Sequence, residues 1–166
     1  MKKLKLAVEM VPDPLHQKNV RTAVSRKVWD LIRKRVYQSA AYTCQLCGND
    51  SGKVEAHEIW HYDDRKHIQT LVGLIALCKS CHALKHIGFS MYTETGQSIF
   101  SRDKLIKHFC RVNGVRKERF FSHENDSMIL HDERGAHEWT QDMSLLTDIK
   151  KSFKEGTDMP LRKAKK

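Results

Sequence analysis

The chain has 166 residues, with 30 Lys or Arg against 20 Asp or Glu, so its formal net charge is +10. A domain this basic is typically drawn to a polyanion, most often nucleic acid, although a solubilising charge or a basic tail is the alternative. No stretch reaches the roughly 18 apolar residues that a membrane span needs, and no targeting signal is visible. We therefore expect a cytoplasmic protein with no membrane partner.

The N-terminal part of the chain predicts an arm followed by a basic helix. Leu4–Val20 is rich in turn-forming residues and is expected to be extended, wrapping over the core. Ser25 can cap a helix, and apolar residues recur after it at helical spacing as far as Ser39. Arg33 and Lys34 lie on the flanks of this helix, where they either contact DNA or are merely solvated.

Two strands and a helix are expected between residues 42 and 90. Val54–Trp60 and Ile68–Leu77 are predicted strands separated by an acidic loop. Cys78–Ile87 fits a helix, and Gly88 is predicted to end it in a left-handed conformation. The order strand, strand, helix predicts an α+β core with flanking helices.

The C-terminal part predicts two capped helices. Ser101 caps a helix expected to run through Val112, and Ser144–Lys154 is expected to be the last helix. Arg119–His123 and Met128–His131 are predicted to be short strands, and Met159–Lys166 a basic, disordered tail. The expected divisions are an arm and basic helix (1–41), a core (42–90), a C-terminal extension (91–158) and a tail (159–166).

Four of the five cysteines form two Cys-x-x-Cys pairs, Cys44 with Cys47 and Cys78 with Cys81. Each pair bends the chain so that both sulfurs face one point, and four thiolates are typical of a closed structural zinc site. The alternative, two redox dithiols, lacks any other thioredoxin-like feature. We therefore predict a structural Zn²⁺ that contributes to folding free energy. Cys110 lies in a helical pattern and is expected to be a buried apolar residue.

Histidines beside the second cysteine pair are candidate ligands for another ion. His82 directly follows Cys81, and His86 lies four residues later, so both imidazoles share one face of the predicted helix. His57 lies on the first predicted strand. Helix histidines at this spacing either hold a divalent ion or contact phosphate, and their position beside a zinc-binding cysteine favours the ion.

At these positions the chain resembles the HNH endonuclease family. The resemblance implies a ββα-metal fold braced by the four-cysteine zinc site and one catalytic divalent ion, Mg²⁺, Mn²⁺, Ni²⁺ or Zn²⁺. It also implies hydrolysis of phosphodiester bonds in DNA, which we expect to be double-stranded. The residues that carry it are Cys44-Gln45-Leu46-Cys47, Glu55-Ala56-His57-Glu58-Ile59 and Leu77-Cys78-Lys79-Ser80-Cys81-His82-Ala83-Leu84-Lys85-His86.

The resemblance also assigns roles to individual residues. In the favoured alignment His57, His82 and His86 hold the catalytic ion, and Glu58 takes the position of the general base. His57 and His82 are therefore counted with Glu58 as catalytic residues. The expected nucleic-acid contacts are the basic side chains Lys79, Lys85, Arg33 and Lys34.

The base position departs from the family pattern. Glu58 stands where the family usually has histidine, and a carboxylate with an ordinary pKa near 4.3 is a weaker base near neutral pH. In an alternative alignment His57 is the base and Ala56 occupies the ligand position, which leaves one ligand fewer. His61 is a further candidate base, and an exposed strand-end histidine is its simpler interpretation.

A second departure is Gly73, which stands where the family has an asparagine that holds the hairpin loop; Asp63 and Asp64 are candidates to order the loop instead. These departures keep two alternatives open, a zinc-stabilised DNA-binding module without catalysis and a protein-interaction adaptor. A homodimer is a further expectation, because a nuclease with one site needs two copies to cut both strands.

Overall fold

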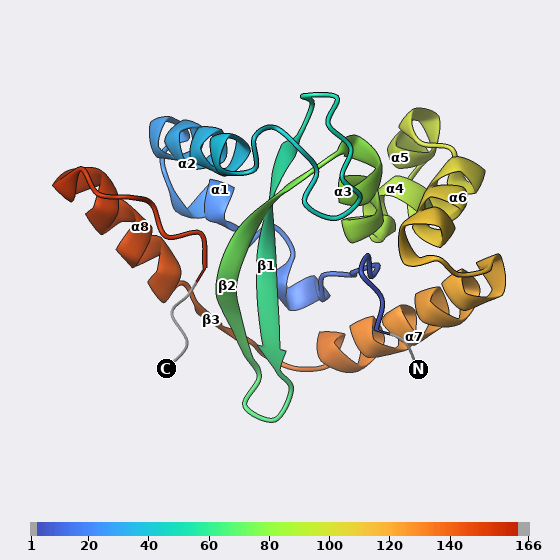
Figure 1. Cartoon of the computed structure of the whole chain (residues 1–166). Coiled ribbons are helices and arrows are strands. Elements are labelled where there is room, and N and C mark those ends of the chain that lie inside the picture. The colour runs from blue at the N-terminus through green and yellow to red at the C-terminus, as the bar shows by residue number, and fades with distance from the viewer. Residues whose placement is uncertain (1–2, 163–166) are drawn as a thin grey trace.

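A long antiparallel hairpin runs through the middle of the molecule (Figure 1). The computed structural model describes residues 3–162, and the hairpin consists of β1 (Glu55–Asp63) and β2 (Ile68–Leu77). A short strand, β3 (Thr140–Asp142), pairs in parallel with the start of β2, so the sheet order is β1-β2-β3. The predicted strand pair is confirmed, and β1 extends three residues beyond its predicted end.

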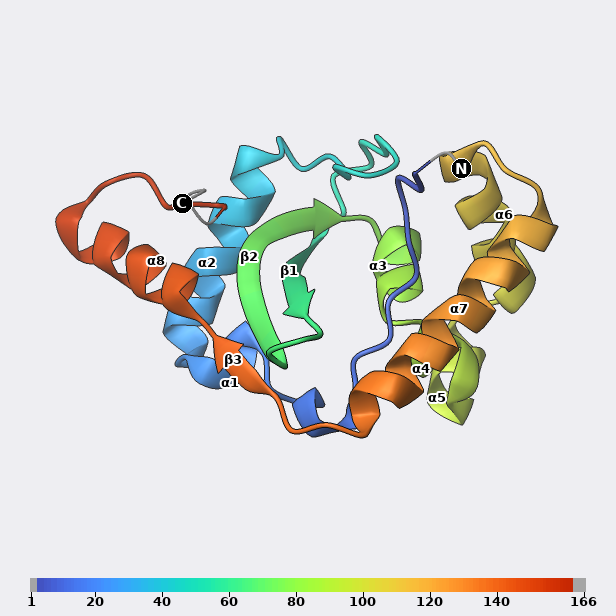
Figure 2. The same cartoon turned by 90° about the horizontal axis from the view of Figure 1, so that it is seen from below.

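Helices cover the hairpin from two sides (Figures 1 and 2). On one side lie α1 (Val20–Ala23), α2 (Arg26–Ser39) and α8 (Ser144–Glu155). On the other side lie α3 (Lys79–Lys85), α4 (Ile87–Tyr92), α5 (Glu94–Ile99), α6 (Arg102–Asn113) and α7 (Lys117–Gly135). The α+β class is therefore confirmed. Within residues 3–162 no helix is long and apolar enough to cross a membrane.

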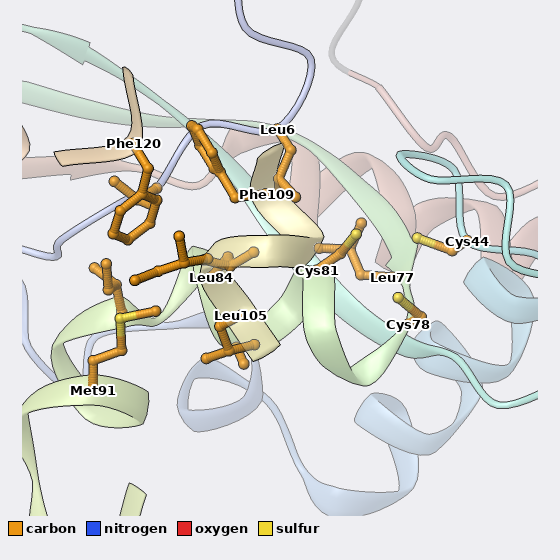
Figure 3. Packing of buried hydrophobic residues seen from close by; sticks show 14 of the residues in the cluster. Leu6, Cys44, Leu77, Cys78, Cys81, Leu84, Met91, Leu105, Phe109 and Phe120 are labelled. Atoms are coloured by element: carbon orange, nitrogen blue, oxygen red, sulfur yellow. The ribbon is translucent and has the colours of Figure 1, made fainter. Parts of the chain in front are cut away.

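Successive side chains of a strand point to opposite faces, so the hairpin contributes to two hydrophobic cores. The core beneath α2 and α8 includes Val36, Leu71 and Ile149, all fully buried. The core beneath α3 and α6 includes Leu84 and Phe109, and Figure 3 shows it reaching the cysteines of the first turn of α3. The cysteine cluster is thus continuous with the second core.

The predicted N-terminal arm is confirmed. Its backbone is irregular apart from one 3₁₀ turn at Asp13–Leu15, and it buries Leu6 and Val8 in the second core. Asn113, at the end of α6, accepts hydrogen bonds from the Leu6 N–H at 2.9 Å and donates one to the Leu6 carbonyl at 2.8 Å. The arm is therefore fixed beside α3 and α6 (Figure 2).

The predicted helix boundaries hold where a cap is present. Ser25 accepts a hydrogen bond from the Val28 N–H at 3.4 Å, and Ser101 one from the Lys104 N–H at 3.4 Å. Gly114 ends α6 with a φ of 63°, in the left-handed region where glycine carries no Cβ penalty.

Three sequence-based expectations were wrong. Residues 119–123 and 128–131 are not strands, because both segments lie inside the continuous helix α7. Gly88 does not end the helix that carries the cysteines: α3 ends at Lys85, and Gly88 lies inside α4. In the expected tail, Met159 and Leu161 pack on the first core and Leu161 accepts a hydrogen bond from the Leu74 N–H; residues 163–166 lie outside the described residues.

Candidate metal centre

The four paired cysteines meet at one point. The sulfurs of Cys44, Cys47, Cys78 and Cys81 all lie within 4.8 Å of one another, and those of Cys47 and Cys78 are 3.6 Å apart. All four are free thiols, so no disulfide competes with metal binding. Three of them are buried, and together they form a possible zinc site of the kind that the spacing predicts.

Local backbone geometry explains why each pair converges. The Gly48 N–H donates to the Cys44 carbonyl at 2.9 Å, and Gly48 adopts a φ of 76°, which closes a tight turn around the first pair. Cys78 is the residue before α3 and Cys81 lies in its first turn, so the helix start directs both sulfurs to the same side.

The thiols shift one another's pKa values, and a bound dication would favour the deprotonated form of all of them. Hydrogen bonds from Cys78 and Cys81 lower the pKa of the Cys44 thiol. Donating to Cys44 raises the pKa of Cys78 to about 11, and the pKa of Cys81 is raised for the same reason. One thiolate forms readily, and the next are opposed by its charge. A bound Zn²⁺ stabilises all four thiolates together.

His108 of α6 contacts this cluster from outside the motif. Its Nε2 lies 3.1 Å from Cys81 Sγ, and its Nδ1 is 2.9 Å from an Arg111 guanidinium nitrogen. Arginine can only donate, so Nδ1 is the acceptor and Nε2 carries the hydrogen. The imidazole therefore donates to the Cys81 sulfur, as partners of metal ligands commonly do.

Three histidines form a second cluster on the neighbouring face. Nitrogens of His57, His82 and His86 lie within 4.8 Å of one another, and the ring centroids are 4.7–5.2 Å apart. β1 carries His57, α3 carries His82, and His86 is the capping residue directly after the end of α3. The structure therefore brings together the three histidines that the sequence singled out.

The donor atoms in this cluster suit a metal ion. Both nitrogens of His57 are buried without a hydrogen-bond partner, which is costly unless something else satisfies them. His82 Nδ1 lies 2.5 Å from a Glu55 carboxylate oxygen, an arrangement that leaves Nε2 free to bind metal. Burial, followed by repulsion from His57 and His82, lowers the pKa of His86 to about 3, so this ring is neutral and keeps its lone pair.

Glu58 lies apart from the imidazoles. Neighbouring strand residues point to opposite faces, and the Glu58 carboxylate accepts a hydrogen bond of 3.1 Å from the Val20 N–H at the start of α1. Glu58 nevertheless lines a cavity of about 330 Å³ that His57 and His86 also line. His61 is exposed and is not among the residues lining this cavity.

Gly73 is explained by its neighbours. It pairs with Arg162 in an isolated antiparallel bridge, and a Cβ at this position would lie 2.7 Å from Arg162 Cδ and 3.0 Å from the Leu161 carbonyl oxygen. An asparagine therefore does not fit here. Asp63 orders the hairpin loop by accepting hydrogen bonds from the next backbone N–H groups, and Asp64 pairs with Arg134 of α7.

Three of the four basic residues expected to bind nucleic acid have partners within the protein. Lys85 forms an ion pair with Glu9, Arg33 forms one with Asp30, and Lys79 lies 5.2 Å from the Phe100 ring centroid. Lys34 is exposed on α2. The cavity wall adds basic groups that the sequence did not single out, namely His16, Lys18, His131 and Arg134.

Sequence reasoning missed Glu9, Glu55 and His108. Glu55 had a usable signal, because it lies two residues before His57 and so shares its face of the strand. Glu9 and His108 had none, since folding alone brings them to the clusters.

Compared with protein-family models, with curated proteins and with solved structures, the chain matches none of them, so its function has to be argued from this geometry.

Proposed function

We propose that the protein is an HNH-type endonuclease that hydrolyses phosphodiester bonds in DNA with one divalent ion, beside a structural zinc. The observation that carries the proposal is the cluster of His57, His82 and His86 on a strand–strand–helix unit next to four thiols. The buried, partnerless nitrogens of His57 fit metal ligation better than a purely structural role.

A divalent ion bound to these imidazoles supplies a Lewis acid that stabilises negative charge on the phosphate and on the leaving oxygen. Neutral imidazoles add no negative charge of their own to the ion. The Glu55 carboxylate orients His82, and Lys85 at the cavity wall attracts a phosphate group. Net positive charge adds affinity that does not depend on sequence.

Glu58 is the proposed base that accepts a proton from the attacking water. Its carboxylate lines the cavity, and the Val20 N–H holds it in one orientation. General-base catalysis of this kind contributes typically 10²–10⁴-fold. We therefore expect Glu58→Gln to lower cleavage about 100-fold or more while leaving DNA binding intact.

The test is cleavage of supercoiled plasmid by zinc-loaded protein with Mg²⁺, Mn²⁺ or Ni²⁺. We expect metal-dependent nicking that His82→Ala and His86→Ala abolish. His137→Ala is the matched control, because His137 is exposed and stacks on His67 in the hairpin loop. Cleavage by His82→Ala at the wild-type rate would remove the histidine cluster from the chemistry.

A second candidate is a zinc-stabilised DNA-binding module without catalysis. It is favoured by the Glu58 carboxylate, which accepts its hydrogen bond from Val20, and by Gly73, which leaves no room for the family's asparagine. Salt-sensitive DNA binding without cleavage in any of the three metals would establish this candidate instead.

A further inference from the structure

The N-terminal arm brings a carboxylate to the histidine cluster. Glu9 Oε2 lies 3.7 Å from His57 Nε2, and Glu9 Oε1 lies 2.5 Å from Lys85 Nζ. The preceding residue, Val8, is buried, and its N–H donates to His123 Nε2 of α7 at 3.1 Å. The backbone beside Glu9 is therefore anchored, and the carboxylate is held at the cluster by the fold.

The distance between Glu9 and His57 is informative. A separation of 3.7 Å is too long for a hydrogen bond, and neither nitrogen of His57 has a partner. Two ligands of one tetrahedral ion, each about 2.0–2.1 Å from it, lie about 3.3 Å apart. The two groups are thus spaced much as two ligands of one ion are. Glu9 lies outside the group of donor atoms that are all within 4.8 Å of one another, so its carboxylate has to shift towards the other ligands to complete the site.

We propose that Glu9 is the fourth protein ligand of the divalent ion held by His57, His82 and His86. The inference rests on the proposed function only in assuming that these histidines bind an ion. One carboxylate joins three neutral imidazoles, so the site carries one negative charge towards the dication. Ion binding then fixes the arm to the hairpin and to α3, which links metal occupancy to the order of a segment outside the strand–strand–helix unit.

Lys85 provides a way to separate ligation from simple charge pairing. In the structure its ammonium contacts the Glu9 carboxylate, and its side chain is only 13% exposed. An ammonium beside a metal ligand competes with the ion for the carboxylate. Lys85→Met removes this competitor and leaves Glu9 in place, so it should retain or increase affinity for the ion.

The experiment titrates Ni²⁺ into full-length protein already loaded with one zinc, followed by calorimetry. Imidazole ligands suit Ni²⁺. We expect Glu9→Gln to weaken Ni²⁺ binding at least about tenfold, since loss of even an outer partner costs 10–100-fold. Glu9→Asp keeps a carboxylate and should recover part of the affinity. Glu94→Gln, an exposed residue at the start of α5, is the matched control and should bind as wild type.

Limited trypsin digestion gives a second readout that needs no substrate. Ni²⁺ should slow cleavage after Lys5 and Lys18, on either side of Glu9, in the wild type but not in Glu9→Gln. Wild-type Ni²⁺ affinity in Glu9→Gln would overturn the ligand assignment alone. Equal weakening in Lys85→Met and Glu9→Gln would also overturn it, because Glu9 would then act through Lys85. A wild type that binds no Ni²⁺ would overturn both this inference and the proposed catalytic ion.

Discussion

The role of His108 follows from its contacts in the folded protein and not from its spacing in the sequence. Its Nε2–H donates to Cys81, while Arg111 donates to its Nδ1. Four thiolates around Zn²⁺ carry a net charge of −2, and this donor reduces the charge on one sulfur inside a buried site. We predict that His108→Phe releases zinc to a chelator at least about tenfold faster than wild type.

A colorimetric zinc chelator followed over time measures this release. His137→Phe is the matched control, because His137 contacts neither cluster among the interactions described. Equal release rates in His108→Phe and wild type would show that the contact with Cys81 does not support the zinc site.

His123 makes the anchoring of the arm sensitive to pH. Burial, together with the charge of Arg119, lowers the pKa of His123 below its ordinary value of 6.5, and the Val8 N–H donates to its unprotonated Nε2. The folded protein therefore holds the neutral ring. Stability from this group is complete above pH 6.5 and is lost as the pH falls from there towards the lower folded pKa.

We predict that His123→Gln, which keeps an acceptor but does not titrate, loses less unfolding free energy than wild type between pH 7 and pH 5.5. The difference is at most about 1.4 kcal/mol per pH unit. Urea unfolding of zinc-loaded protein at both pH values measures it, with Lys85, Asp126 and Glu9 as the other charged groups near the ring. Identical losses in the two proteins would mean that His123 does not govern this step.

The candidate site was predictable where its signal is local. Cysteine spacing identified the thiol cluster, and the spacing of His82 and His86 identified two of the imidazoles. The orientation of Glu58 was not predictable, because a hydrogen bond from Val20, 38 residues earlier, fixes it. Roles that depend on side-chain direction follow from tertiary contacts, which spacing does not encode.

At the scale of elements, helices with clear caps and one apolar face were predicted well. α7 was not, because its apolar residues do not lie on one face: Phe120 is fully buried, whereas Phe121 and Ile129 are 45% and 51% exposed. Its order comes from partners elsewhere, including the buried Glu124, which binds Arg102 of α6 and the Tyr92 hydroxyl of α4. Short apolar runs without helical periodicity were therefore mistaken for strands.

Two helical glycines provide an internally controlled test of packing between elements. A Cβ on Gly96 of α5 would lie 1.9 Å from the Phe89 carbonyl oxygen of α4, whereas a Cβ on Gly135 at the end of α7 would meet nothing within 4 Å. We predict that Gly96→Ala destabilises the protein by at least about 2 kcal/mol. Gly135→Ala should stabilise it by up to about 1 kcal/mol, since alanine favours the helix.

Urea unfolding of the two zinc-loaded variants beside wild type measures both effects. If the same Gly→Ala substitution lowers the unfolding free energy at Gly96 and raises it at Gly135, the backbone contact between α4 and α5 at Gly96 is confirmed. A neutral Gly96→Ala would contradict that contact.

The whole molecule is built from segments far apart in the sequence. Asn113 holds Leu6 across 107 residues, and β3 pairs with residues of β2 that lie 72 positions earlier. Leu161 accepts a hydrogen bond from the Leu74 N–H at the sheet edge. The central hairpin and α3 were predictable because their contacts are local. The arm, β3 and the C-terminal segment close around that unit. The arm supplies Glu9, and the arm and α7 together supply most of the basic cavity wall.

The net charge of +10 belongs to the whole molecule, and the salt dependence of DNA binding distinguishes a DNA-binding protein from an adaptor. Each phosphate contact makes the logarithm of DNA affinity fall with the logarithm of salt concentration by about 0.9. Lys34 is exposed on α2, whereas Lys151 on α8 lies 3.8 Å from Glu155. We predict that Lys34→Ala reduces the salt slope for duplex binding by about 0.9, the contribution of one phosphate contact. Lys151→Ala should leave the slope unchanged.

Fluorescence anisotropy with a labelled duplex at several salt concentrations measures the slopes, with no divalent ion added so that cleavage does not interfere. A slope lowered by Lys34→Ala places α2 against the DNA backbone. An unchanged slope in that variant would move the contact surface away from α2 and towards the basic wall of the cavity. Binding that does not depend on salt in the wild type would contradict phosphate recognition altogether, because a charge of this size cannot approach a polyanion without releasing counterions.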